Sequence, residues 1–213
     1  MTETKNWFQI YDQEALKRRR LQKHRQKLKK IGILQASREN KILDLCCGQG
    51  EMLQLLASEG FQYLTGVDEM DSQYVQTTGR WKFHQQSVVQ YDGGARDWDW
   101  ILCAHAMHHF KQLHEIPKLL ENAYQWLKPG GQLVIIDHFD SIPLRVAYGI
   151  LQTPLACLTA WTKDFRKQLI EEHDYLYHYL DRWREVEQYL VTSVFKNFTI
   201  QRDLFFFYFR ATK

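Results

Sequence analysis

Cysteine and proline are scarce in this sequence, which has four of each among 213 residues. The cysteines at positions 46, 47, 103 and 157 have no metal-binding spacing, and a chain of this size buries a core without disulfides. We therefore expect neither a metal site nor a disulfide-stapled miniprotein. The hydrophobic content of 45% and the aromatic content of 14% exclude a disordered or collagen-like chain.

Long apolar runs are missing from the amino-terminal part, which is polar and then basic. We expect no signal peptide and a cytoplasmic protein. One stretch, from Ile142 to Trp161, is about as long as a membrane span, but it contains Pro143, Arg145 and Pro154. We predict a buried or interfacial segment there rather than a membrane span.

The net charge of +3 is unevenly distributed along the chain. Residues 1–41 contain 12 Lys and Arg against 4 Asp and Glu, whereas the remainder is net acidic. Residues 17–30 have no proline or glycine and predict an exposed helix with a thin apolar seam. A plain solvated surface helix is one interpretation; peripheral contact with an anionic membrane, with nucleic acid or with an acidic substrate is the other.

Strands and helices alternate in the central part of the sequence. Short apolar runs predict strands at 41–46, 63–67, 81–85, 100–104 and 132–137, and helical spacing predicts helices at 51–59 and 117–127. This alternation is typical of a doubly wound, mostly parallel, Rossmann-like α/β sheet covered by helices on both faces. Ligands of such sheets bind at the carboxyl ends of the strands.

Outside this α/β core, the sequence predicts three further segments. The pattern from Pro143 to about Val194 is helical and rich in aromatic residues, and we interpret it as a lid over the ligand-binding edge. Residues 199–202 and 205–211 predict an antiparallel pair of strands that completes the sheet. The expected organisation is a basic helical segment (1–40), a cofactor-binding core (41–140), a helical lid (141–194) and carboxyl-terminal strands (195–213).

The turn after the first predicted strand has the residues of a nucleotide-binding turn. Gly48 and Gly50 let a ligand approach the backbone amides at the start of a helix. A dinucleotide fingerprint needs a third glycine where this chain has Leu53, and Glu51 in the first helical turn would repel a pyrophosphate. The turn therefore favours a ligand without phosphate.

Two aspartates near this turn indicate which ligand it binds. Asp44 offers a carboxylate to an ammonium group, and Asp68, at the end of the second strand, is placed to accept hydrogen bonds from both hydroxyls of a ribose. These features together specify a nucleoside joined to an amino acid.

Four stretches resemble the class I S-adenosylmethionine-dependent methyltransferases, in the order found in that family. They are I-L-D-L-C-C-G-Q-G (42–50), T-G-V-D (65–68), W-D-W-I-L-C-A-H-A-M-H-H-F (98–110) and L-K-P-G-G-Q-L-V-I-I-D (127–137). The D-L-C-C-G form of the turn is similar to the branch that methylates quinones and other small molecules. The resemblance implies S-adenosyl-L-methionine as cofactor.

The resemblance also implies roles for individual residues. The cofactor-binding positions that match are Tyr11, Asp44, Cys46, Gly48, Gly50, Asp68, Met70, Gln86, Ser87 and Ala104. Cys46 stands where the family has its first glycine, which implies less room at the turn. Tyr11 would close over the cofactor from the amino-terminal helix, and Gln86 or Ser87 would replace the acid that often binds the adenine amine.

Two histidines follow the predicted strands at the edge where an acceptor must lie. His105 and His138 are the candidate catalytic groups, and His138 is the preferred base or orienting residue. For His108 and His109, packing or backbone capping is the simpler explanation. The expected function is methyl transfer to an oxygen or nitrogen, and possibly a carbon, of a small apolar or aromatic acceptor.

Two other functions stay open at this point. The basic helix permits methylation of RNA or another nucleic acid, although the stretch after the fourth strand lacks the sequences typical of base-methylating enzymes. A non-catalytic module that binds the cofactor is also consistent with the fold. The sequence does not indicate an oligomeric state.

Overall fold

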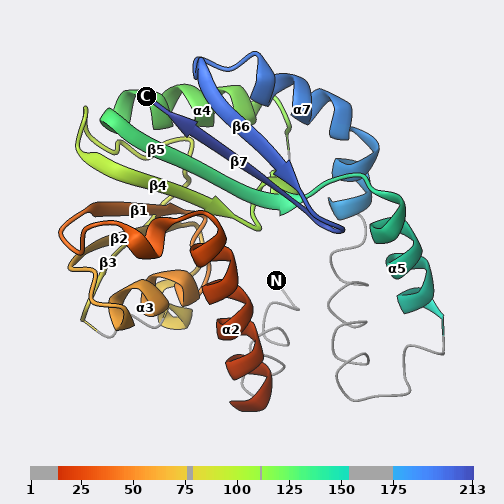
Figure 1. Ribbon diagram of the computed structural model, residues 1–213, viewed down its shortest axis with the longest axis horizontal. Coiled ribbons are helices and arrows are strands. Elements are labelled where there is room, and N and C mark those ends of the chain that lie inside the picture. Colours follow the sequence, from red (N-terminus) through yellow and green to blue (C-terminus); the bar gives the residue numbers. More distant parts are fainter. Residues whose placement is uncertain (1–13, 76–78, 111, 154–174) are drawn as a thin grey trace.

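The computed structural model describes residues 14–75, 79–110, 112–153 and 175–213, which form a seven-stranded sheet with helices on both faces (Figure 1). The strands are β1 (Lys41–Leu45), β2 (Tyr63–Asp68), β3 (Lys82–Gln85), β4 (Trp98–Ala104), β5 (Leu127–His138), β6 (Asn197–Arg202) and β7 (Phe206–Thr212). Their order is β3-β2-β1-β4-β5-β7-β6. The first five strands pair in parallel, and β7 pairs antiparallel with β5 and β6. The predicted Rossmann-like sheet with antiparallel carboxyl-terminal strands is confirmed.

The helices cover the two faces of the sheet in separate layers. They are α2 (Glu14–Lys30), α3 (Glu51–Ser58), α4 (Glu115–Trp126), α5 (Ile142–Gln152) and α7 (Trp183–Val191), with short 3-10 turns at Ile33–Gln35, Ser72–Tyr74 and Met107–His109. Figure 1 shows α4 and α7 on one side of the sheet and α2 and α3 on the other. The strands therefore lie between two apolar clusters, one under each layer.

Consecutive residues of the central strands supply these two clusters in turn. Leu43 and Ile135 point toward α4 and α7, whereas Ile42 and Val134 point toward α2 and α3. Side chains alternate across a strand, so a strand buried on both faces needs an unbroken apolar run. This is why the runs at β1 and β5 were readable from the sequence.

Strand β5 is longer than the predicted strand at 132–137, because it begins at Leu127. The register between β4 and β5 shifts between Trp98 and Trp100, so the Pro-Gly-Gly segment is an irregularity within the strand rather than a separate turn. Gly131 is required there, since a Cβ would lie 2.9 Å from the carbonyl oxygen of Lys128 and 3.0 Å from that of Trp98.

The segment 141–194 contributes to the core as well as to the surface. Trp183, Val186 and Leu190 of α7 are buried in the cluster under α4, and the Trp183 ring lies 4.7 Å from that of Phe207. Helix α7 is thus a layer of the core, which differs from the expected lid. Residues 154–174, on which most of that prediction falls, lie outside the described residues.

Helix α5 covers the first half of the stretch that has membrane-spanning length. It buries Leu144 and Tyr148 but exposes Ile142, Val146 and Ile150 along another face. Among the described residues, no helix combines the length and the apolar character that crossing a membrane requires.

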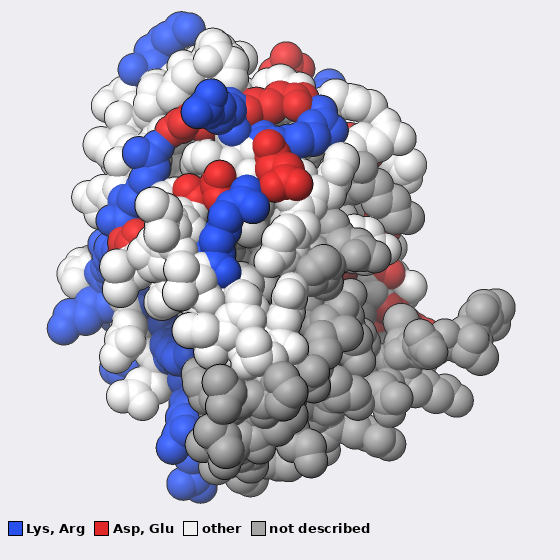
Figure 2. Space-filling model, turned by 90° about the vertical axis from the view of Figure 1, so that its right-hand side faces the viewer, with Lys and Arg blue, Asp and Glu red and all other residues white. Residues whose placement is uncertain are grey.

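The basic helix α2 has an outer and an inner face. Arg18, Arg19, Lys23, Arg25, Lys29 and Lys30 are exposed. Figure 2 shows Lys and Arg side chains following one another along one edge of the molecule. Leu28 and Ile31 are buried against the sheet, so the helix packs along its apolar seam as the sequence predicts.

Candidate active site

The turn between β1 and α3 lies where strand order reverses, since β1 pairs with β2 on one side and with β4 on the other. Three of its residues have left-handed backbone conformations: Cys46 (φ 56°), Gly48 (φ 53°) and Gly50 (φ 78°). A non-glycine residue in this region is strained by about 1–3 kcal/mol. Because Cys46 stands in place of the family's first glycine, it strains the backbone of the turn as well as reducing the space there.

The turn is packed on one side and open on the other. A Cβ at Gly50 would lie 2.2 Å from Cζ2 of Trp81, so the indole ring fills the space beside this glycine. A Cβ at Gly48 would meet no heavy atom within 4 Å. Space for a ligand beside the backbone is therefore at Gly48, at the carboxyl end of β1.

Asp68 connects this turn to the end of β2. Its Oδ2 accepts a 2.8 Å hydrogen bond from the amide of Gly48, and its Oδ1 accepts one of 2.8 Å from the amide of Met70. A carboxylate has about four lone-pair sites, so hydroxyl donors can still bind to it. The predicted ribose-binding residue therefore faces the open part of the turn.

Asp44 is the second carboxylate at this turn, and it is buried within β1. Burial, together with the nearby Asp68 carboxylate, raises the pKa of Asp44 to about 8. A cationic ligand group beside Asp44 would offset this repulsion. Asp44 therefore fits the ammonium group of an amino acid.

The predicted adenine-binding residues lie at the ends of β2 and β3. Met70 is half-buried against the cluster under α3, and Ser87 is half-buried. Gln86 is exposed, and its side-chain amide donates to the carbonyl oxygen of Gln90 at 3.0 Å. Ala104 ends β4 beside the turn, whereas Tyr11 lies outside the described residues.

His105 follows β4 directly and is held in a left-handed backbone conformation with φ 57°. Its amide donates to the carbonyl oxygen of Ile136 at 2.7 Å. Its ring centroid lies 5.1 Å from that of Phe206 and 6.1 Å from that of His138. Burial, and next the neighbouring Lys27 ammonium, hold the pKa of His105 well below its usual range, so the ring is neutral at pH 7.

His138 ends β5 on the same edge. Its Nδ1 lies 3.2 Å from the carbonyl oxygen of Phe205, and its ring packs 4.5 Å from that of Phe206. Burial lowers the pKa of His138 to about 4. When Nδ1 carries the proton and donates it to this carbonyl, Nε2 presents a lone pair, as a proton acceptor requires. The structure thus brings together both predicted catalytic histidines.

A buried carboxylate, Asp137, organises the end of β5. It accepts hydrogen bonds of 2.7 Å from the amides of Met107 and His138, and Nδ1 of His108 lies 2.7 Å from its Oδ1. Burial raises the pKa of Asp137, but the His108 imidazole outweighs this effect and holds the pKa well below its usual range. His108 is therefore a buried hydrogen-bond partner of Asp137, a role that differs from simple packing or capping.

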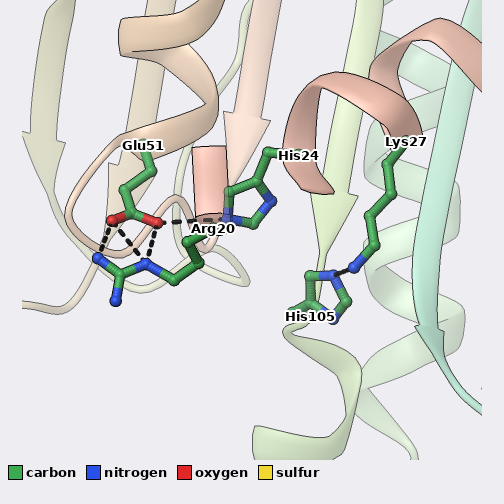
Figure 3. A network of polar contacts seen from close by, with 5 residues as sticks. All are labelled: Arg20, His24, Lys27, Glu51 and His105. Carbon is green, nitrogen blue, oxygen red and sulfur yellow. Dashed lines mark hydrogen bonds and ion pairs between the residues drawn. The ribbon is translucent and has the colours of Figure 1, made fainter. Parts of the chain in front are cut away.

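Helix α2 approaches the same edge with three polar side chains (Figure 3). Nε of Arg20 donates to both oxygens of Glu51 at 2.9 Å, and Nε2 of His24 lies 3.3 Å from Oε2 of Glu51. One turn further along, Lys27 contacts Nε2 of His105. Part of the basic run therefore reaches the site, and Glu51 is neutralised by α2 instead of standing as an unpaired charge.

Sequence reasoning missed Arg20, Lys27 and Asp137 as parts of the site. Arg20, His24 and Lys27 are spaced i, i+4 and i+7, which places them on one helix face. That spacing was a usable signal, but identical charges on the other faces of α2 hid it. No group of three or more His, Cys, Asp and Glu side chains arranged to hold a metal occurs in the described part of the chain.

Comparison with known proteins gives a consistent family. Residues 12–190 match the family model described as a methyltransferase domain. The chain is 31% identical over 107 residues to YqeM of Bacillus subtilis (strain 168), which is named as a methyltransferase, covering 47% of this chain and 43% of that protein. It is 28% identical over 134 residues to the methyltransferase sll0829 of Synechocystis sp. (strain ATCC 27184 / PCC 6803 / Kazusa), covering 57% and 58%. The chain thus spans about half the length of these curated relatives.

Solved structures share the fold at low sequence identity. A crystal structure of a Methanococcus maripaludis protein (mmp1179), described as an S-adenosyl-L-methionine-dependent methyltransferase, superposes with a TM-score of 0.61. The identity is 17%, with 100% of this chain and 97% of that chain covered. The plantazolicin methyltransferase BpumL, in complex with a monoazolic desmethylPZN analog and SAH, gives a TM-score of 0.55 at 15% identity, covering 96% and 88%.

Proposed function

The chain belongs to the methyltransferase-domain family, and we propose that it transfers a methyl group from S-adenosyl-L-methionine to an oxygen or nitrogen of a small, rather apolar or aromatic acceptor. The observation that carries the cofactor assignment is the open turn at Gly48 with Asp44 and Asp68 beside it. This site offers backbone amides and two carboxylates to a ligand that bears an amino acid and a ribose.

Each part of the turn has a role in binding this cofactor. Asp44 would accept the α-ammonium group, and Asp68 would accept the ribose hydroxyls. Met70 lies directly after them and would pack against the base, since it is half-buried and flexible. When bound, the cofactor supplies a methyl group on a positively charged sulfur.

The acceptor site is proposed at the ends of β4 and β5. His105, His138 and Phe206 meet there, and both imidazoles are neutral because burial lowers their pKa. Neutral rings and a phenyl group favour an apolar or aromatic molecule over a highly charged one. His138 would take a proton from an acceptor hydroxyl or amine through Nε2, while the Phe205 carbonyl orients its ring.

Methyl transfer of this kind needs alignment more than acid catalysis. The residues supply a fixed edge, because Asp137 holds the amides of Met107 and His138 and thereby both loops that follow β4 and β5. Positioning of two reactants accounts for a large part of many enzymatic rate increases. The rigid carboxylate network is therefore the part of the site that sets geometry.

The experiment that tests the proposal has two steps. Isothermal titration calorimetry with S-adenosylhomocysteine measures cofactor binding, and formation of this product from S-adenosylmethionine is then followed with a panel of phenols, amines and lipids. We expect binding and turnover with at least one apolar acceptor. Binding without turnover across the panel would favour a cofactor-binding module.

The catalytic assignment is tested by His138→Ala, with His114→Ala as the matched control. His114 is exposed at the start of α4, on another part of the molecule. We expect His138→Ala to slow turnover more than it weakens binding of S-adenosylhomocysteine, and His114→Ala to do neither. An unaltered rate in His138→Ala would remove the base from the mechanism.

A further inference from the structure

We infer that Lys27 of α2 binds the ionised oxygen of the methyl acceptor, which makes the acceptor a phenol. This inference rests on the proposed function and adds the substrate class and a residue that recognises it. It starts from the surroundings of the Lys27 side chain, which faces the end of β4 rather than solvent (Figure 3).

Lys27 is a half-buried cation without a carboxylate partner in the described part of the chain. Its Nζ contacts Nε2 of His105 and lies 4.0 Å from the centre of the Phe206 ring. The more exposed Lys30 of the same helix makes an ordinary ion pair with Asp203. A buried ammonium that faces an imidazole and a phenyl ring is costly unless an anion joins it.

The two carboxylates nearest to Lys27 are already occupied. Asp137 accepts from two backbone amides at 2.7 Å and pairs with His108. Asp203 accepts from the amides of Phe205 and Phe206 at 3.0 and 2.8 Å and from the hydroxyl of Tyr208 at 3.0 Å. Either carboxylate would give up hydrogen bonds that it already accepts if it turned toward Lys27. No carboxylate among the described residues therefore pairs with Lys27, and a ligand can supply the anion.

The charged and titratable groups around Lys27 come from several elements. Lys23 faces it from its own helix, Asp137 from the end of β5 and Asp203 from the segment between β6 and β7, while His105 and His138 are close by. Burial lowers the pKa of Lys27 to about 8, although Asp137 opposes the shift. With this pKa, most Lys27 side chains are still ammonium at pH 7.

The position and surroundings of Lys27 select a phenol among anionic acceptors. Phe206, His105 and His138 place three rings within contact distance of one another beside the ammonium. The aromatic ring of a phenol packs well against these three rings. This packing places the phenol oxygen next to the Lys27 ammonium. A free carboxylate on an aliphatic chain would satisfy the charge but leave the rings unmatched.

The proposed step balances as follows. The phenol hydroxyl gives its proton to Nε2 of His138, and the resulting phenolate pairs with the Lys27 ammonium. A lone pair of the phenolate oxygen forms the new O–CH3 bond while the C–S bond of the sulfonium breaks and its electrons pass to sulfur. The His138 imidazolium then releases its proton to solvent, and the products are an aryl methyl ether and a neutral thioether.

The test uses 4-nitrophenol, because its phenolate is yellow and the neutral phenol is colourless. It is titrated into the full chain saturated with S-adenosylhomocysteine, at a pH about one unit below its pKa in solution. We expect wild type to bind it as the phenolate, and Lys27→Met to bind it about 10- to 100-fold more weakly with unchanged affinity for S-adenosylhomocysteine. Lys27→Arg, which keeps the charge, should restore phenolate binding.

Lys29→Met is the matched control, since Lys29 is exposed on another face of the same helix. Phenolate binding that is equal in wild type and Lys27→Met, or binding of the neutral phenol only, would overturn the inference. Methylation of amines but not phenols would overturn it while leaving the proposed function in place. Absence of any methylation, with Lys27-dependent phenolate binding retained, would instead contradict the proposed function alone.

Discussion

Nδ1 of His108 lies 2.7 Å from Oδ1 of Asp137, in the interior of the protein at the end of β5. The same carboxylate accepts from the amides of Met107 and His138, so it fixes the backbone after β4 and after β5 at once. Any disturbance of this pair should therefore affect stability and the catalytic edge together.

Asp137→Ala should lower the free energy of unfolding by about 3–5 kcal/mol, because it leaves buried donors and a buried imidazole without their partner. Urea denaturation measures this loss. Asp140→Ala is the control, since Asp140 is exposed and its ion pair with Arg145 is worth less than about 1 kcal/mol. Equal losses in the two variants would contradict the role given to Asp137.

The same pair predicts how stability depends on pH. The folded-state pKa of Asp137 lies below its unfolded value of about 3.9. Its contribution is therefore fully present above that value and is lost as the pH falls toward the folded-state pKa. The urea midpoint of wild type should fall more steeply from pH 5 to pH 3 than that of Asp137→Ala.

Asp68→Ala should weaken binding of S-adenosylhomocysteine by about 1–3 kcal/mol, the range for hydrogen bonds to a charged group. Titration calorimetry measures the change. Glu69→Ala is the control, because Glu69 is the next residue in the chain and its side chain is exposed. Because Asp68 also holds the amides of Gly48 and Met70, Asp68→Asn separates charge from turn geometry. Unchanged affinity in Asp68→Ala would count against the ribose assignment.

Asp44 predicts a proton release when the cofactor binds. Its pKa of about 8 in the free protein means that it is mostly protonated at pH 7, whereas a bound ammonium favours the ionised form. Cofactor affinity should therefore rise with pH up to about pH 8. Calorimetry in two buffers of different ionisation enthalpy counts the protons, and Asp44→Asn should release none. The same release from both proteins would show that another group titrates.

The remaining prediction concerns the outer face of α2. We expect residues 17–30 to make peripheral contact with an anionic membrane or with nucleic acid. Binding to anionic vesicles or to RNA should weaken steeply as salt concentration rises. Replacing the exposed Arg19 and Lys29 by Ala should weaken it further, whereas Lys118→Ala on α4 should not. Binding that ignores salt concentration would exclude an electrostatic contact.

The sequence predicts the sheet well because its central strands are buried on both faces. The apolar runs around Leu43 and Ile135 exclude half-exposed strands, in which apolar and polar residues would alternate. Glycines mark where the first of these runs ends. The start of β5 at Leu127 was missed, since a strand that continues through Pro-Gly-Gly depends on pairing with β4. Pairing of this kind is a tertiary property.

The candidate site likewise has residues that the sequence predicts and residues whose roles depend on tertiary contacts. Asp44, Gly48 and Asp68 are predictable because the turn and its neighbours are local in sequence. Lys27 and Asp137 were not, since their roles depend on contacts with residues 78 and 29 positions away. In a run of many basic residues, the sequence alone does not show which side chain faces the site, because this depends on how the helix packs against the sheet.

The position of β7 between β5 and β6 has a consequence for how the protein is made. Ribosomes deliver β6 and β7 after every other described strand, so one side of β5 stays unpaired from the time β5 is made until β7 is made. Its residues Leu133 to Ile136 are apolar on both faces, and an open strand of this type invites pairing with other chains. Nascent chains halted before Phe206 should therefore depend on chaperones, and Phe206 itself would reach the histidines only after β6 has been made.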